Sequence, residues 1–135
     1  MLFFINNSNT AIDFSRIFLA INIYDNDTNK LVDYCQPSVL IEMDEVKIGV
    51  IGAIGDCYSS ISAEQVKDVY FETGSALTQL VKEESTRLRG LGADFIIYSL
   101  HDGNESSKSG VGNISDSALT YYDLSLSSGY VDLVL

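Results

Sequence analysis

Apolar residues gather in runs that are separated by polar, turn-forming segments. The run "IFLAINIY" (17–24) is followed by "DNDTNK", which predicts a strand that ends in a turn. The runs "SVLIEM" (38–43) and "VKIGVIGAI" (46–54) flank Asp44 and Glu45, and the second begins with alternating apolar residues. This pattern predicts a hairpin that leads into a buried strand.

The spacing of apolar residues changes to that of a helix from Ser75 onward. The apolar stripe consists of Leu77, Leu80, Val81, Leu88 and Leu91, and Gly92 is placed to end the helix. Glu83 stands four residues before Arg87, a spacing that favours an ion pair on the helix surface. Upstream, Ser62 and Gln65 have the spacing of a capping box, which predicts a short helical turn.

Two further strands and a second helix are predicted in the last third of the chain. The segment "ADFIIYSL" (93–100) is almost continuously apolar, as is typical of a strand in a sheet covered on both faces. A loop then leads to a helix from Ser115 that carries Leu119, Tyr122 and Leu126 and ends at Gly129. The final run "YVDLVL" predicts another buried strand.

This order of elements favours an α/β fold with a parallel sheet and right-handed crossovers. We found no internal repeat and no linker, so residues 1–135 are predicted to form a single unit. In a parallel sheet, ligands bind beyond the carboxyl ends of the strands. That edge is therefore where functional residues are expected.

Composition limits the classes of partner. The 135 residues are 46% hydrophobic, and their formal net charge is -11. This charge disfavours a nucleic acid polymer or an anionic membrane and suits metal cations or basic partners.

No apolar run approaches the length of a membrane span, no signal sequence is evident, and no compartment is predicted. Cys35 and Cys57 lack the spacing of a zinc site, so reduced thiols are expected.

Polar residues follow two of the predicted strands at their carboxyl ends. Asp56 and Cys57 follow the second strand of the hairpin, and His101 and Asp102 follow "ADFIIYSL". His101 is the only histidine, and its imidazole could be a metal ligand, a general base or a structural group bonded to a loop. One alternative is a Cys/His hydrolase in which Cys57 is the nucleophile, His101 the base and Asp102 the orienting group. No nucleophile motif accompanies these residues.

Together, four segments resemble the middle of a calcineurin-like metallophosphoesterase domain of the 5'-nucleotidase type. They are "FLAINI", "KIGVIGAIG", "GADFIIYSLHDG" and "GYVDLVL". The first three are similar to the family segments "fpfLaaNi", "kigviGl" and "gaDvIIvlsHxG". The resemblance covers nearly the whole chain and implies a partial metallophosphoesterase-like β-sandwich that is flanked by helices and has mostly buried strands.

The resemblance implies that His101 ligates one of two divalent metal ions, such as Mn, Zn or Fe, that hydrolyse a phosphate ester, a nucleotide included. Asp102 and Gly103 complete the local motif, and Asp102 or a loop carbonyl would hold the second ring nitrogen of His101. The family's Asp-x-His, Gly-Asp, Gly-Asn-His and Gly-His-x-His motifs are not found in the sequence. We therefore expect a fragment that lacks the N-terminal and C-terminal motif segments and is inactive by itself.

A non-catalytic function is the second hypothesis. A stand-alone acidic α/β module could bind a partner, or a second copy of itself, through exposed sheet edges. This hypothesis requires association in solution and no hydrolysis, whereas the phosphoesterase hypothesis requires metal binding at His101.

Overall fold

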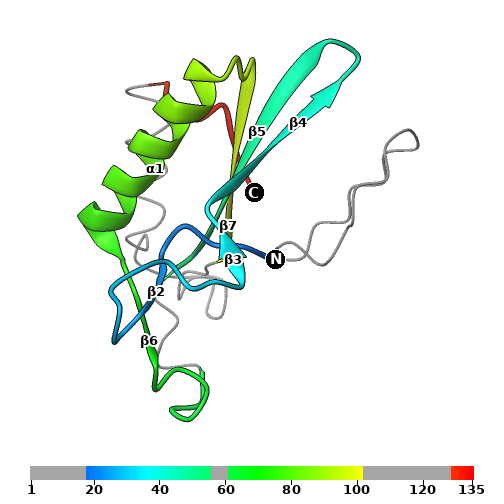
Figure 1. Cartoon of the computed structure of the whole chain (residues 1–135). Coiled ribbons are helices and arrows are strands. Elements are labelled where there is room, and N and C mark those ends of the chain that lie inside the picture. Colours follow the sequence, from blue (N-terminus) through cyan, green and yellow to red (C-terminus); the bar gives the residue numbers. More distant parts are fainter. Residues whose placement is uncertain (1–17, 56–60, 102–128) are drawn as a thin grey trace, which may run out of the picture.

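The structure is a computed structural model that describes residues 18–55, 61–101 and 129–135 (Figure 1). The predicted helix from Ser115 lies outside these residues. In the described part, sheets and one helix form a mixed α/β arrangement, in agreement with the predicted fold class.

The largest sheet in the described residues has four strands in the order β4-β5-β7-β8. The strands are β4 (Ser38–Met43), β5 (Val46–Ile54), β7 (Phe95–His101) and β8 (Leu133–Val134). The last three strands run parallel to one another, and β4 pairs antiparallel with β5 at the edge. The predicted hairpin is confirmed, because Asp44 and Glu45 both have a positive φ, of 49° and 71°, as a two-residue hairpin turn requires.

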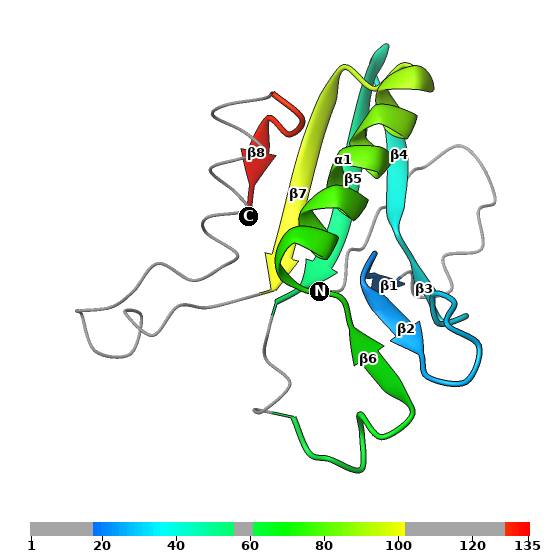
Figure 2. The same cartoon turned by 90° about the vertical axis from the view of Figure 1, so that its left-hand side faces the viewer.

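Helix α1 (Gly74–Gly90) covers one face of this sheet (Figure 2). Its buried apolar residues Leu77, Val81 and Leu88 pack into the main core with Ile51, Ile96 and Tyr98 of the sheet. A Cβ added at Gly49 would lie 2.8 Å from Ile96 Cδ1 and 2.9 Å from Leu88 Cδ1, so the glycine lets the helix approach the strand closely. No helix among the described residues has both the length and the apolar content that crossing a membrane requires.

The prediction of one strand over residues 17–24 is wrong. The chain forms β1 (Phe18–Leu19), bends, and then forms β2 (Ile23–Asp25). β1 pairs parallel with β3 (Cys35–Gln36), and β2 pairs with a different partner. The bend lies at Asn22, whose side chain is fully buried and hydrogen-bonded to two other segments.

The turn predicted at Ser62 is present but does not continue as a helix: Gln65 N–H donates to the Ser62 carbonyl oxygen at 2.9 Å, and Ser62 Oγ donates to Gln65 Oε1 at 3.2 Å. The residues from Ser62 form successive turns that lead into a short strand, β6 (Val69–Phe71). β6 pairs antiparallel with β2 and brings Tyr70 against Tyr24, with ring centroids 5.5 Å apart. After this turn, pairing with the distant strand β2 decides the structure of β6.

Arg87 pairs with Glu84 rather than with Glu83 as predicted. Arg87 Nε and Nη2 donate to the Glu84 carboxylate at 2.9 and 2.7 Å, and Ser38 Oγ also donates to it. Burial acts to raise the pKa of Glu84, but the bonds from Arg87 and Ser38 outweigh it, so the pKa lies below its usual range. Glu84 is preferred because it faces the sheet, whereas Glu83 is exposed and accepts from Gln79.

The last predicted strand is confirmed as β8, which is shorter than the apolar run. Asp132, the residue before β8, makes two hydrogen bonds that fix the start of this strand. Its Oδ2 atom accepts from Arg89 Nη2 at 2.6 Å and from the backbone N–H of Ile96 at 2.7 Å. One carboxylate thus joins the end of α1, β7 and the entry to β8.

The sheet face opposite α1, which we call the open face, carries an apolar surface. The strand register places Met43, Val46, Phe95 and Leu133 on this face, and they are 60, 46, 37 and 41% exposed. Among the described strand residues of β4, β5, β7 and β8, the only ionisable side chain on this face is His101. The open face thus combines exposed apolar groups with very little charge.

Candidate functional site

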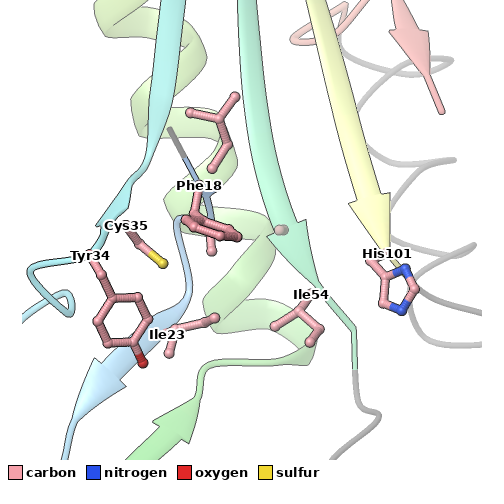
Figure 3. A pocket seen from close by; sticks show the side chains of 9 residues that line it. Phe18, Ile23, Tyr34, Cys35, Ile54 and His101 are labelled. Atoms are coloured by element: carbon pink, nitrogen blue, oxygen red, sulfur yellow. The ribbon is translucent and has the colours of Figure 1, made fainter. Parts of the chain in front are cut away.

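The carboxyl ends of β5 and β7 lie side by side, and His101 is the last residue of β7. His101 is in register with Ile54, and Gly55 N–H donates to the His101 carbonyl oxygen at 3.0 Å. The His101 side chain is exposed and lies on the open face, beyond the end of the sheet (Figure 3). An imidazole at this place is available to a ligand, as the position at the strand end predicted.

A cavity of about 290 Å³ is lined by His101 together with residues of β1 and of the end of β5. Its lining is mostly apolar and includes Phe18, Ile23, Tyr34, Cys35 and Ile54 (Figure 3). Figure 3 shows His101 and Cys35 on opposite sides of Phe18 and Ile54, so the thiol and the imidazole do not face each other. Burial raises the pKa of the Cys35 thiol, which keeps it protonated at neutral pH. Cys35 is therefore a wall residue of this cavity.

Asn22 fixes the end of β5 next to His101. Its Oδ1 accepts from Ile54 N–H at 3.0 Å, and its Nδ2 donates to the carbonyl oxygens of Ile54 at 2.6 Å and Glu72 at 2.8 Å. Glu72 N–H in turn donates to the Asn22 carbonyl oxygen at 3.0 Å. One amide side chain thus fixes the strand that neighbours His101 and the segment that leads into α1.

Gly52 allows β1 to cross β5 and form a wall of the cavity. A Cβ at this position would lie 2.3 Å from the Leu19 carbonyl oxygen, far closer than real atoms approach. Ile21 N–H donates to the Gly52 carbonyl oxygen at 2.8 Å. The crossing places Phe18 over the cavity, because β1 begins at that residue.

Several predicted site residues lie outside the described residues. They are Asp56, Cys57, Asp102 and Gly103. The role of Asp102 in holding the second ring nitrogen of His101 and the Cys57-His101-Asp102 alternative therefore stay predictions. Within residues 18–55, 61–101 and 129–135, no three His, Cys, Asp or Glu side chains gather closely enough to hold a metal ion. The described part thus offers one imidazole at the strand ends, which does not complete a two-metal centre.

No protein-family model matches the chain, and no curated protein matches it. The chain does match solved structures. A putative 5'-nucleotidase from Staphylococcus aureus matches with a TM-score of 0.60 and 22% identity, over 86% of this chain and 22% of that one. The chain shares a partial metallophosphoesterase-like fold with this structure.

A second structure with this metallophosphoesterase fold supports the assignment. The sulfate thiohydrolase SoxB of Thermus thermophilus matches with a TM-score of 0.57 and 18% identity, over 67% of this chain and 16% of that one. This chain thus spans a small part of the length of the structures that it matches. The match confirms the fold that "KIGVIGAIG" and "GADFIIYSLHDG" predicted.

Sequence reasoning missed the roles of Asn22 and Gly52. The signal for Asn22 was present, because it is the one polar residue inside "IFLAINIY". A polar side chain in an apolar run requires buried hydrogen-bond partners, which a plain strand does not supply. Gly52 gave no comparable signal, since three glycines occur in "GVIGAIG" and spacing alone does not show which one contacts another strand.

Proposed function

We propose that this chain is part of a metal-dependent phosphoesterase domain that hydrolyses phosphate esters, nucleotides among them. The observation that carries the proposal is His101 at the carboxyl end of β7 in a metallophosphoesterase fold. In this proposal His101 ligates one of two divalent cations, such as Mn, Zn or Fe. The exposed imidazole supports this role, and a chain with a net charge of -11 attracts cations.

By itself the chain is proposed to be inactive. A catalytic metal site in a protein is normally held by three or more side chains, and the described residues offer one at this edge. The further ligands would come from a larger domain, which we propose has residues 1–135 as one portion. Asp102, the residue after His101, is proposed to fix the imidazole through its second ring nitrogen.

Metal binding at His101 can be tested directly because the chain has a single histidine. In an NMR titration with Mn²⁺, we expect the imidazole signals to broaden at lower metal concentrations than signals from the exposed acidic turn at Asp25 and Asp27. An Asp27→Asn variant is the matched control and should leave the imidazole response unchanged. Broadening that affects the acidic turn first, with no selective effect at His101, would contradict the metal-ligand role.

The proposed inactivity has its own test. A phosphatase assay with phenyl phosphate and Mn²⁺ or Zn²⁺ should show no turnover above the buffer rate. Metal-dependent turnover that His101→Ala abolishes would overturn the proposed inactivity and would still support the phosphoesterase function. Turnover that survives His101→Ala would contradict both proposals.

The apolar open face favours a second candidate function, a non-catalytic module that associates with another copy. Large exposed apolar patches mark interaction surfaces, and Met43, Val46, Phe95 and Leu133 expose apolar side chains on this face. In light scattering we expect an assembly larger than the monomer, and Val46→Glu should reduce it. Thr86→Glu, on the exposed side of α1, is the control. A monomer at all concentrations would exclude this function.

A further inference from the structure

The cavity beside His101 differs in chemistry from the rest of the molecule. The chain is strongly acidic, but among the described residues that line the cavity none carries a carboxylate, an ammonium or a guanidinium group. Burying a charged group against such walls is costly, whereas a neutral apolar group gains from leaving water. The lining therefore selects for an uncharged apolar ligand group.

Two aromatic side chains define the shape of this lining. Phe18 comes from β1 and Tyr34 from the segment before β3, and both line the cavity while remaining 44 and 58% exposed. Figure 3 shows the two rings on the same side of the cavity as Cys35 and Ile23. Aromatic rings pack well against other rings in stacked or edge-to-face arrangements. An aromatic group in the cavity would therefore cover surface that is now in water.

The size of the cavity limits the ligand. Small-molecule pockets commonly range from about 300 to 1,000 Å³, and this cavity, of about 290 Å³, lies at the lower end. It suits one ring system rather than a larger apolar chain. His101 is one of the lining residues, so a ring inside the cavity has substituents near the imidazole.

We propose that this cavity binds the neutral aromatic group of a phosphate ester, with Phe18 and Tyr34 as its specificity-determining residues. The proposal rests on the proposed function, in which the phosphate of the same ester lies at His101. A ring-bearing ester is thus favoured over an ester of a small aliphatic alcohol. The aromatic group makes its contacts with the chain's own side chains, so binding does not require the metal ions.

Cys35 gives a readout of binding that is independent of activity. In a Cys57→Ser variant, Cys35 is the one thiol of the chain. Its modification by a thiol reagent can be followed over time at alkaline pH, because burial keeps the thiol protonated at neutral pH. In metal-free buffer we expect phenyl phosphate to slow this modification and methyl phosphate to leave it unchanged. These two probes carry the same charge and differ in the ring. At a concentration ten times its Kd, a protecting probe slows the reaction about elevenfold.

Variants test which residues hold the ring. In the Cys57→Ser background, Tyr34→Ala should reduce the protection by phenyl phosphate at least threefold, and Phe18→Ala should act in the same direction. Phe95→Ala is the matched control, because Phe95 is a partly exposed aromatic residue of the open face outside the cavity. Circular dichroism checks that each variant is folded. Because Tyr34 is the more exposed residue, its variant keeps the test valid if Phe18→Ala does not fold.

His101→Ala separates this inference from the proposed function. Phenyl phosphate should protect Cys35 in this variant as well, since the ring and not the phosphate fills the cavity. Equal protection by methyl phosphate, or none by phenyl phosphate, would overturn the cavity assignment whatever the metal titration shows. If phenyl phosphate protects Cys35 selectively but Mn²⁺ does not broaden the His101 imidazole signals, the aromatic site is supported and the metal-ligand role of His101 is contradicted.

Discussion

The crossing of β1 over Gly52 gives the sharpest stability prediction. Replacing Gly52 by alanine puts a methyl group 2.3 Å from the Leu19 carbonyl oxygen and 2.4 Å from Leu19 Cβ. Non-bonded carbon atoms prefer about 3.5 Å or more, so β1 must retreat by about 1 Å. Backbone cannot rotate away as a side-chain terminus can, and therefore the strand itself has to move.

The expected cost follows from two contributions. Overpacking a well-packed site costs about 1–3 kcal/mol. Retreat of β1 also breaks the 2.8 Å hydrogen bond from Ile21 N–H to the Gly52 carbonyl oxygen, which is worth about 1 kcal/mol net. We therefore expect Gly52→Ala to lower the free energy of unfolding by about 3 kcal/mol, which corresponds to a fall in Tm of about 10–15 °C in a chain of this size.

Two other glycines serve as controls in the same thermal and urea unfolding assays. At Gly49 the added Cβ lies under 3 Å only from the ends of the Ile96 and Leu88 side chains, which can shift, so Gly49→Ala should cost about 1–2 kcal/mol. At Gly90 nothing lies within 4 Å, and Gly90→Ala should be neutral or stabilise the helix by up to about 1 kcal/mol. A Gly52→Ala protein as stable as Gly90→Ala would refute the assignment of β1 to this crossing.

Two further predictions concern buried polar groups. Asn22→Leu should cost about 3 kcal/mol in urea unfolding, since three partly buried backbone groups lose their partner. Asn26→Ala removes an exposed bond to the Lys67 carbonyl oxygen and should cost under about 1 kcal/mol; equal costs would contradict the role of Asn22. Glu84→Gln should cost about 1.5 kcal/mol at pH 7, and Glu83→Gln almost nothing. Because the folded-state pKa of Glu84 is lowered, its stabilisation is complete above the unfolded value of about 4.3 and is lost as the pH falls through the folded value. The difference between wild type and Glu84→Gln should therefore shrink below about pH 4, and a difference independent of pH would contradict the ion pair.

The fold was most predictable where local pattern and tertiary packing agree. The alternation in "VKIGVIGAI" and the helical stripe from Leu77 to Leu88 both mark faces that are buried in the structure. The carboxyl end of β7 could be located for the same reason, and with it His101. These features follow from periodicity, which a single segment contains in full.

Where distant segments decide the structure, the pattern was misleading. The run from Ile17 to Tyr24 is apolar enough for one strand, but the buried bonds of Asn22 to Ile54 and Glu72 bend it. Glu83 has the favoured spacing to Arg87, but Arg87 pairs with Glu84 on the buried side of the helix. Ser38, which lies 46 residues before Glu84, donates a hydrogen bond to the same carboxylate. The cavity beside His101 depends on the crossing at Gly52, which no local spacing encodes.

The separation in sequence of the Asn22 contacts has a consequence for the order of folding. β4 and β5 form a hairpin, and α1 leads directly into β7, so these units can form through short-range contacts. The Asn22 side chain instead bonds to residues 32 and 50 positions away, and closing such loops costs conformational entropy before the bonds form. The strand end beside His101 should thus become ordered after the hairpin and the α1-β7 unit. Substitutions at Asn22 should then speed unfolding more than they slow folding.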